Sequence, residues 1–299
     1  MKIVITGANG LLGQKLVDLL GSKPEIQVLA TGLGPCRILN LPPNVHYQTC
    51  DITKPEELSI VTEPFRPDVV IHSAAMTNVD ECELNPEKCH LLNVVATKNM
   101  LDVCERFGSH LIHLSTDFIF DGKSGPYSEY DVPNPISIYG QSKLDAETLI
   151  QKVDRFPWSI VRTVLVYGIA PGLSRSNIIL WVQASLEQGK GIEVVDDQFR
   201  TPTLAEDLAA GCILIAEKKA TGIFNISGKD FLTPYQMALK TAEYFGLDAS
   251  LITKATASTF SQPAKRPPRT GFIIEKARNE LGYNPHSFDE GIRILEKQL

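Results

Sequence analysis

Long apolar runs are missing from this chain of 299 residues, which argues against a membrane-spanning protein. The N-terminal segment lacks the pattern of a signal peptide. No pair among the six cysteines has C-x-x-C spacing, and no histidine stands at ligand spacing from them, so neither zinc nor a disulfide framework is expected. Lys and Arg are scattered and the net charge is −6, which disfavours a nucleic-acid or membrane surface. We expect a cytoplasmic protein with no metal site.

Short apolar runs do occur, and they alternate with amphipathic stretches as far as about residue 168. This rhythm predicts an α/β protein with a doubly wound parallel (Rossmann) sheet. The alternation then becomes irregular and proline more frequent. We expect a dinucleotide-binding domain over residues 1–168, to which 192–227 adds. Residues 169–191 and 228–299 are expected to form a smaller C-terminal substrate-binding lobe.

A glycine-rich loop, "TGANGLLGQ", lies between the first predicted strand and the first predicted helix. It spaces Gly7, Gly10 and Gly13 so that the chain turns tightly, approaches a pyrophosphate with its backbone and packs helix against strand. The helix N-terminus then offers N–H groups to the phosphates. An ordinary glycine-rich turn is the alternative, but the position in the first βα unit favours dinucleotide binding.

The end of the second predicted strand indicates which nicotinamide cofactor is used. NAD-specific sites usually carry Asp or Glu there, and "VLATGLGPCRIL" has neither. Arg37 is near enough to meet a 2′-phosphate, so NADPH is favoured and NADH stays possible. Arg37 could instead be an exposed surface residue.

A hydroxyl, a phenol and an ammonium group form the candidate catalytic set. "IYGQSKLDAE" places Tyr139 and Lys143 four residues apart on one face of a predicted helix. Thr116 follows Ser115 at the end of the fifth strand, where parallel strands face the cofactor. We expect Lys143 to lower the pKa of Tyr139, which would exchange a proton with a substrate oxygen. The six histidines show no pairing and none is assigned to catalysis.

Two loops in the C-terminal half carry basic residues together with proline, "DDQFRTPT" and "AKRPPR". Arginine can clamp a diphosphate through two hydrogen bonds. We therefore consider Arg200, Lys265 and Arg266 as candidates for binding the diphosphate of a nucleotide sugar. For each of them a solvated surface charge is an equally good interpretation.

Several of these motifs, in this order, resemble the extended short-chain dehydrogenase/reductases: TGxxGxxG, "HSAA", "STD" and YxxxK. Nearly the whole chain is similar to a narrower family, the dTDP-4-dehydrorhamnose reductases. The stretches "STDFIFDG", "YGQSKLDAE", "DDQFRTPT" and "PAKRPPRTGF" carry that similarity. The resemblance implies NADPH- or NADH-dependent reduction of the 4-keto group of a deoxyhexulose on a thymidine diphosphate, in dTDP-L-rhamnose synthesis. It also implies a nucleotide-diphosphate sugar as partner and a possible homodimer.

The resemblance also assigns roles to individual residues. Tyr139 would donate the proton, Lys143 would hold the nicotinamide ribose, and Thr116 would hydrogen-bond the 4-keto oxygen, with Asp117 beside it at the substrate. The cofactor contacts that it implies are Gly10, Leu11 and Leu12 at the pyrophosphate, Asp51 and Ile52 at the adenine, and Ser73, Ala74 and Ala75 after the fourth strand.

One departure from the family pattern concerns the sugar. The family often has an aromatic residue in the stretch "TSWVY", and Leu165 stands at that place in "TVLVY". Two other readings therefore stay open. The chain could be a nucleotide-sugar 4-epimerase of the same superfamily, or a regulatory subunit similar to the β subunit of methionine adenosyltransferase.

Overall fold

A parallel sheet of seven strands forms the centre of the computed structural model, which describes residues 1–173 and 177–299. The strand order is β10-β6-β5-β4-β1-β2-β3, and every neighbouring pair is parallel. The order reverses between β1 and β4, as in doubly wound folds. The predicted fold class is confirmed. The strands are β1 (Lys2–Thr6), β2 (Gln27–Gly32), β3 (Val45–Thr49), β4 (Val69–His72), β5 (His110–Thr116), β6 (Trp158–Thr163) and β10 (Gly222–Asn225).

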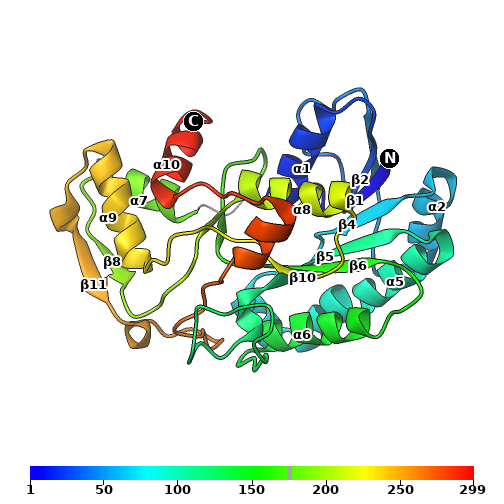
Figure 1. Ribbon diagram of the computed structural model, residues 1–299. Coiled ribbons are helices and arrows are strands. Elements are labelled where there is room, and N and C mark those ends of the chain that lie inside the picture. Colours follow the sequence, from blue (N-terminus) through cyan, green and yellow to red (C-terminus); the bar gives the residue numbers. More distant parts are fainter. Residues whose placement is uncertain (174–176) are drawn as a thin grey trace.

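The central strands are buried on both faces, which explains their continuous apolar sequences. Every residue of β4 and β5 is buried, whereas the edge strand β3 exposes most of its residues. Helices cover both faces of the sheet (Figure 1). On one face lie α1 (Leu11–Gly21) and α8 (Ala205–Lys218), and on the other lie α2 (Pro55–Phe65), α5 (Ala96–Phe107) and α6 (Ile138–Gln151).

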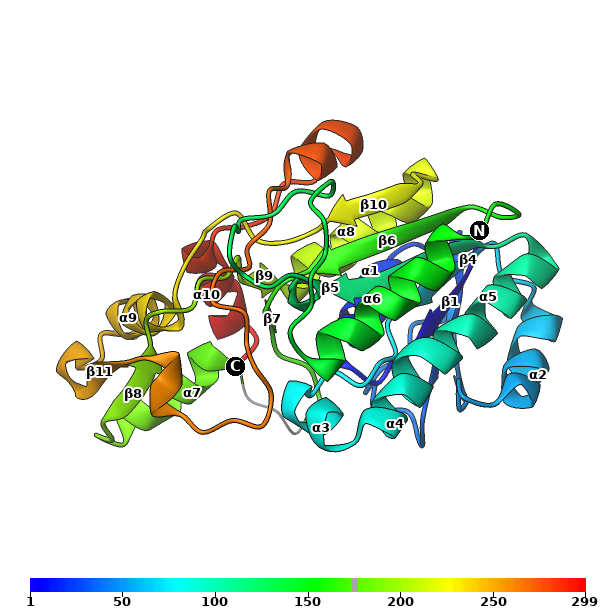
Figure 2. The same ribbon diagram turned by 90° about the horizontal axis from the view of Figure 1, so that it is seen from below.

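Other elements of the C-terminal part of the chain build a smaller body beside the sheet (Figure 2). Its strands β8 and β11 pair in parallel with each other, and β7 pairs with β9, outside the main sheet. Within residues 192–227, β8 therefore lies with this body, while α8 and β10 lie with the sheet; the proposed domain boundaries stay a prediction. The elements are β7 (Val166–Tyr167), α7 (Ile178–Glu187), β8 (Ile192–Val195), β9 (Thr203–Leu204), α9 (Pro234–Phe245), β11 (Ile252–Ala255) and α10 (Phe288–Glu296).

Short helical turns complete the structure. The chain before Gly108 runs through three consecutive helical elements, and Gly108 ends the last of them with φ of +66°. Among the described residues, no helix is long and apolar enough to cross a bilayer. The short elements are α3 (Val79–Leu84), α4 (Pro86–His90), η1 (Leu91–Val95), η2 (Asp117–Ile119), η3 (Ala249–Leu251), η4 (Ala257–Thr259) and η5 (Ala277–Leu281).

Candidate active site

The start of α6 lies directly against the turn that follows β5. The Ser137 hydroxyl caps the helix by accepting a hydrogen bond from the Gly140 N–H. A Cβ atom on Gly140 would lie 2.1 Å from the Phe118 carbonyl oxygen, so no side chain fits at this position. The missing side chain allows the first turn of α6 to approach η2, which places Tyr139 beside Thr116.

Tyr139 is buried, and the Phe118 ring packs against it. Its side chain is 8 % exposed, and the Phe118 ring meets it edge-on with 5.8 Å between ring centroids. Burial raises the pKa of the Tyr139 phenol above its ordinary value, and a hydrogen bond with Thr116 opposes this only in part. The expectation that Lys143 lowers this pKa is therefore wrong, because the pKa lies above its ordinary value. The free-energy cost of burying a phenolate here outweighs the stabilisation that the Thr116 hydrogen bond gives it.

Lys143 is buried one helical turn further along α6, where it meets a histidine. Its Nζ lies 3.3 Å from His113 Nε2, and burial lowers the pKa of Lys143 to about 8. Burial also lowers the pKa of His113, which keeps the imidazole neutral beside the ammonium group. The His113 ring lies 5.3 Å from that of His72. Sequence reasoning missed this pair, because its members lie on two strands, β4 and β5.

Behind Lys143, α6 is fixed to the sheet by a buried ion pair. Glu147 is fully buried, and its carboxylate accepts hydrogen bonds from Arg162 Nε at 3.1 Å and Nη2 at 2.7 Å. The Ser115 hydroxyl donates to the same carboxylate at 2.5 Å. Glu147 thus joins α6 to β5 and β6, and its charge favours the ammonium form of Lys143.

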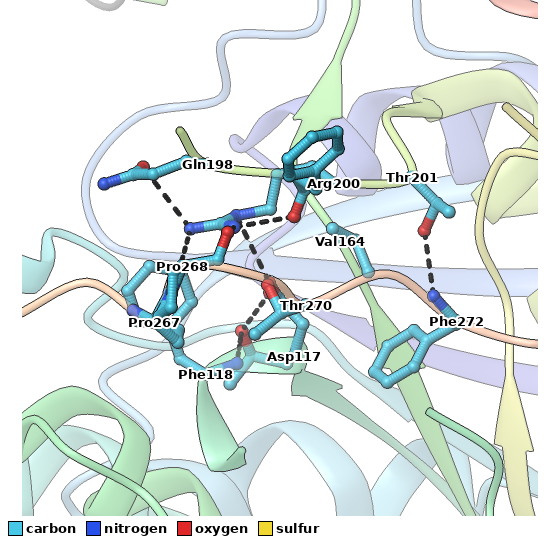
Figure 3. Close-up of polar contacts among 12 residues, drawn as sticks. Asp117, Phe118, Val164, Gln198, Arg200, Thr201, Pro267, Pro268, Thr270 and Phe272 are labelled. Carbon is cyan, nitrogen blue, oxygen red and sulfur yellow. Dashed lines mark hydrogen bonds and ion pairs between the residues drawn. The ribbon is translucent and has the colours of Figure 1, made fainter. Parts of the chain in front are cut away.

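Asp117 contacts two segments of the C-terminal half, through Thr270 and Arg200 (Figure 3). The Thr116 hydroxyl donates to Asp117 Oδ1 at 3.2 Å, and the Thr270 hydroxyl donates to Asp117 Oδ2. Arg200 Nε lies 3.7 Å from the same Oδ2 atom. Burial raises the pKa of Asp117, while Arg200 and Thr270 act in the opposite direction. Sequence reasoning identified Asp117 but missed Thr270, whose partner is 153 residues away.

The three basic residues expected at a diphosphate lie in different environments. The Arg200 guanidinium is buried and donates to the carbonyl oxygens of Phe199 and Pro267, each at 2.7 Å. Arg266 is paired with Asp80 at 2.6 Å, and Lys265 is exposed. The structure therefore does not gather the three on one open surface. Their roles at a diphosphate stay predictions.

The glycine loop has the tight geometry that its sequence predicts. Gly7 has φ of +72°, and a Cβ atom there would lie 2.8 Å from the Ala74 nitrogen. A Cβ atom on Gly13 would lie 2.4 Å from the Gly7 carbonyl oxygen. Helix α1 begins at Leu11 with no side-chain cap and no acidic residue in its first turn. An anion could therefore approach the N–H groups of this turn, including that of Leu12, without charge repulsion.

The segment after β4 lies beside the glycine loop. The Ser73 hydroxyl donates to the Thr6 carbonyl oxygen at 2.6 Å, and the Ala74 N–H donates to the Thr6 hydroxyl at 3.3 Å. Ser73, Ala74 and Ala75 are partly exposed. The structure thus brings together the two segments that were expected to line the cofactor, although their contacts with it stay a prediction.

The residues expected near the adenosine are arranged after β2 and β3. Arg37 is exposed, its N–H donates to Asn9 Oδ1 of the glycine loop at 2.9 Å, and its guanidinium donates to the Gly172 carbonyl oxygen at 3.3 Å. The Asp51 carboxylate accepts a hydrogen bond from the Thr53 hydroxyl at 2.7 Å, and Ile52 is buried. The Arg37 backbone is thus bonded to the glycine loop, and the contact of its side chain with a 2′-phosphate stays a prediction.

Leu165 has an unusual backbone conformation. Its φ is +34°, a region that non-glycine residues rarely adopt, and its side chain is 43 % exposed. It lies between β6 and β7, where its carbonyl oxygen accepts the Thr203 N–H at 3.2 Å. Such strain is often found at ligand sites, which is consistent with the predicted contact between Leu165 and a substrate.

Comparison with known proteins identifies the family. Residues 1–299 match the family described as RmlD substrate binding domain. The chain is 32% identical to the "Probable low-salt glycan biosynthesis reductase Agl14" of Haloferax volcanii, over 99% of this chain and 97% of that protein. It is 30% identical to "Methionine adenosyltransferase 2 subunit beta" of Xenopus laevis, over 90% of this chain and 78% of that protein.

A solved structure supports the same assignment. The dTDP-4-dehydrorhamnose reductase of Bacillus anthracis, solved in complex with NADP, has a TM-score of 0.86 at 25% identity, covering 100% of this chain and 99% of that one. This agrees with the resemblance seen in the motifs. The chain belongs to the RmlD substrate binding domain family, that of the dTDP-4-dehydrorhamnose reductases.

Proposed function

We propose that this protein is an NADPH-dependent reductase of the 4-keto group of a nucleotide-linked 6-deoxyhexulose. The observation that supports it best is the contact of Tyr139 on α6 with Thr116 at the end of β5, with Lys143 buried one turn further along the same helix. Thr116 ends β5 at the carboxyl edge of the sheet, and the glycine loop follows the carboxyl end of β1 in the same parallel sheet. A reductase of the same family, solved with NADP, supports the choice of cofactor class.

The residues of the glycine loop fit a dinucleotide. Gly7 and Gly13 leave no room for side chains of their own, and the first turn of α1 carries no acidic residue. When bound, the nicotinamide would supply a hydride to the substrate carbon. Gly10, Leu11 and Leu12 would hold the pyrophosphate through backbone N–H groups, and Arg37 would favour NADPH over NADH by pairing with the 2′-phosphate.

Tyr139 would supply the proton in this reaction. Because burial raises its pKa, the phenol is protonated at neutral pH and ready to donate to the oxygen of a ketone. Lys143, with a pKa of about 8, is mostly an ammonium group at neutral pH and would stabilise the phenolate left after transfer. Solvent would then return the proton to Tyr139.

A coupled assay tests the proposal. The purified protein would be mixed with dTDP-4-keto-6-deoxy-L-lyxo-hexulose, and absorbance at the nicotinamide band followed with NADPH and NADH in parallel. We expect oxidation of both cofactors, faster with NADPH. An Arg37→Ala variant should lose that preference, and equal rates in the unchanged protein would argue against the role of Arg37.

Tyr139→Phe tests the mechanism. This variant should lose at least about a hundredfold in kcat and keep its affinity for NADPH, because only the proton donor is removed. Tyr130→Phe is the matched control, because Tyr130 is 83 % exposed and should be dispensable. Full activity of Tyr139→Phe would overturn the mechanism.

A regulatory subunit is the second candidate, favoured by the relative named methionine adenosyltransferase 2 subunit beta. In that case the protein would bind NADPH without oxidising it in the presence of the ketosugar. It would also co-purify with a methionine adenosyltransferase catalytic subunit. The coupled assay and this binding assay together separate the two candidates.

A further inference from the structure

The contacts of Asp117 determine the direction in which the Thr116 hydroxyl points. This hydroxyl has a single proton, and it donates that proton to Asp117 Oδ1 at 3.2 Å. The Thr116 oxygen in turn accepts the Phe118 N–H at 3.3 Å. With its proton directed at Asp117, the Thr116 oxygen presents a lone pair to its remaining neighbour, the Tyr139 phenol.

Asp117 itself is held by two residues from distant segments (Figure 3). Its side chain is 3 % exposed, Thr270 donates to Oδ2, and Arg200 Nε lies 3.7 Å from that oxygen. Arg200 is fixed by the carbonyl oxygens of Phe199 and Pro267. The Thr270 N–H donates to the Phe199 carbonyl oxygen at 3.0 Å, so both residues belong to one hydrogen-bonded unit.

We propose that Asp117, held by Thr270 and Arg200, is a positioning residue: by accepting the hydrogen bond of the Thr116 hydroxyl, it leaves the Thr116 oxygen to accept the Tyr139 O–H, which holds the phenol in place at the end of β5. The proposal rests on the proposed function. It gives Thr116, Asp117 and Arg200 internal roles instead of the direct substrate contacts expected from the sequence. It also makes the C-terminal segment around Thr270 necessary for orienting a group at the end of β5.

This role requires an ionised Asp117 carboxylate. The charged and titratable groups that face it are Arg200 from the loop after β8 and Tyr139 from α6, while Arg266 lies close to Arg200. The Thr270 hydrogen bond favours the ionised form. Removing the Thr270 hydroxyl should therefore raise the pH at which Asp117 takes up a proton and Thr116 loses its acceptor.

The test is the pH profile of kcat for ketosugar reduction. Thr270→Val should move the acidic limb of the profile to higher pH and lower kcat at neutral pH about tenfold, while Thr270→Ser should restore both. Thr201→Val is the matched control. Thr201 follows Arg200 and is also buried. Its hydroxyl donates to the Ser227 hydroxyl and accepts the Phe272 N–H, and it has no hydrogen bond with Asp117. This control should keep the wild-type acidic limb.

A second variant decides the question if Thr270→Val does not fold. Asp117→Asn has no carboxyl group to titrate, so it should lose the acidic limb entirely and lower kcat, with the KM for NADPH unchanged. An acidic limb shared by all variants, or wild-type kcat in Asp117→Asn, would overturn the proposal. If the wild-type protein oxidises neither cofactor while these variants fold normally, the proposed function fails first, and this assignment fails with it.

Discussion

At the scale of single residues, burial decides the chemistry of the site. Tyr139 and Lys143 are 8 % and 3 % exposed, and burial disfavours the charged form of each. The pKa of the phenol rises and that of the ammonium group falls to about 8. Under the proposed function, the first shift keeps the phenol protonated and the second leaves Lys143 mostly charged near neutral pH.

Lys143→Met should stabilise the fold in a pH-dependent way. Since the folded pKa of about 8 lies below the ordinary 10.5, burial of the charge costs stability below pH 8. Between pH 8 and 10.5 the unfolded state binds more protons, so this cost fades as pH rises. At about 1.4 kcal/mol per pKa unit, the variant should gain ~3 kcal/mol at pH 7 and much less above pH 10.

Urea unfolding at the two pH values measures this effect. Lys190→Met is the control, because Lys190 is exposed at the end of α7 and should show little change at either pH. A gain for Lys143→Met that is the same at both pH values would contradict the assigned cause.

At the scale of elements, α6 is positioned by contacts at its first turn and at its middle. Gly140 allows its first turn to lie against η2, and Glu147 ties its middle to β5 and β6. The Tyr139–Lys143 spacing is a local property of the helix. The distance of that pair from Thr116 depends on these tertiary contacts.

Glu147→Gln should destabilise the protein by ~3 kcal/mol, because it leaves the buried Arg162 without its charged partner. Glu63→Gln is the matched control, because the Arg106–Glu63 pair is about half exposed and such pairs contribute little. Denaturant unfolding of both variants at one pH gives the comparison. Equal losses in the two variants would show that burial of the Glu147 pair is not decisive.

At the scale of the whole molecule, the C-terminal segment belongs to the core of the sheet. Phe272, Ile274 and Leu281 lie in the same apolar cluster as Ile3 and other strand residues. The Tyr127 N–H donates to the Gly271 carbonyl oxygen at 2.8 Å, and its ring stacks on Phe120 at 4.1 Å. The two bodies are therefore expected to unfold together.

The two tryptophans can test this expectation, because Trp158 lies on β6 and Trp181 on α7. Trp158→Phe and Trp181→Phe variants each leave one reporter, and their denaturation midpoints should coincide. Adding Phe272→Ala to either variant should lower the free energy of unfolding by about 3 kcal/mol and shift both midpoints equally. Two separated transitions would show instead that the smaller body is an independent folding unit.

Periodicity and turn chemistry are local properties, so the elements of the sheet, the glycine loop and the Tyr139–Lys143 spacing can be predicted from the sequence. The burial of Arg200, the contact of His113 with Lys143 and the raised pKa of Tyr139 follow from the three-dimensional arrangement. Desolvation and contacts such as Thr270 with Asp117 depend on segments that are distant along the chain. No local pattern in the sequence carries that information.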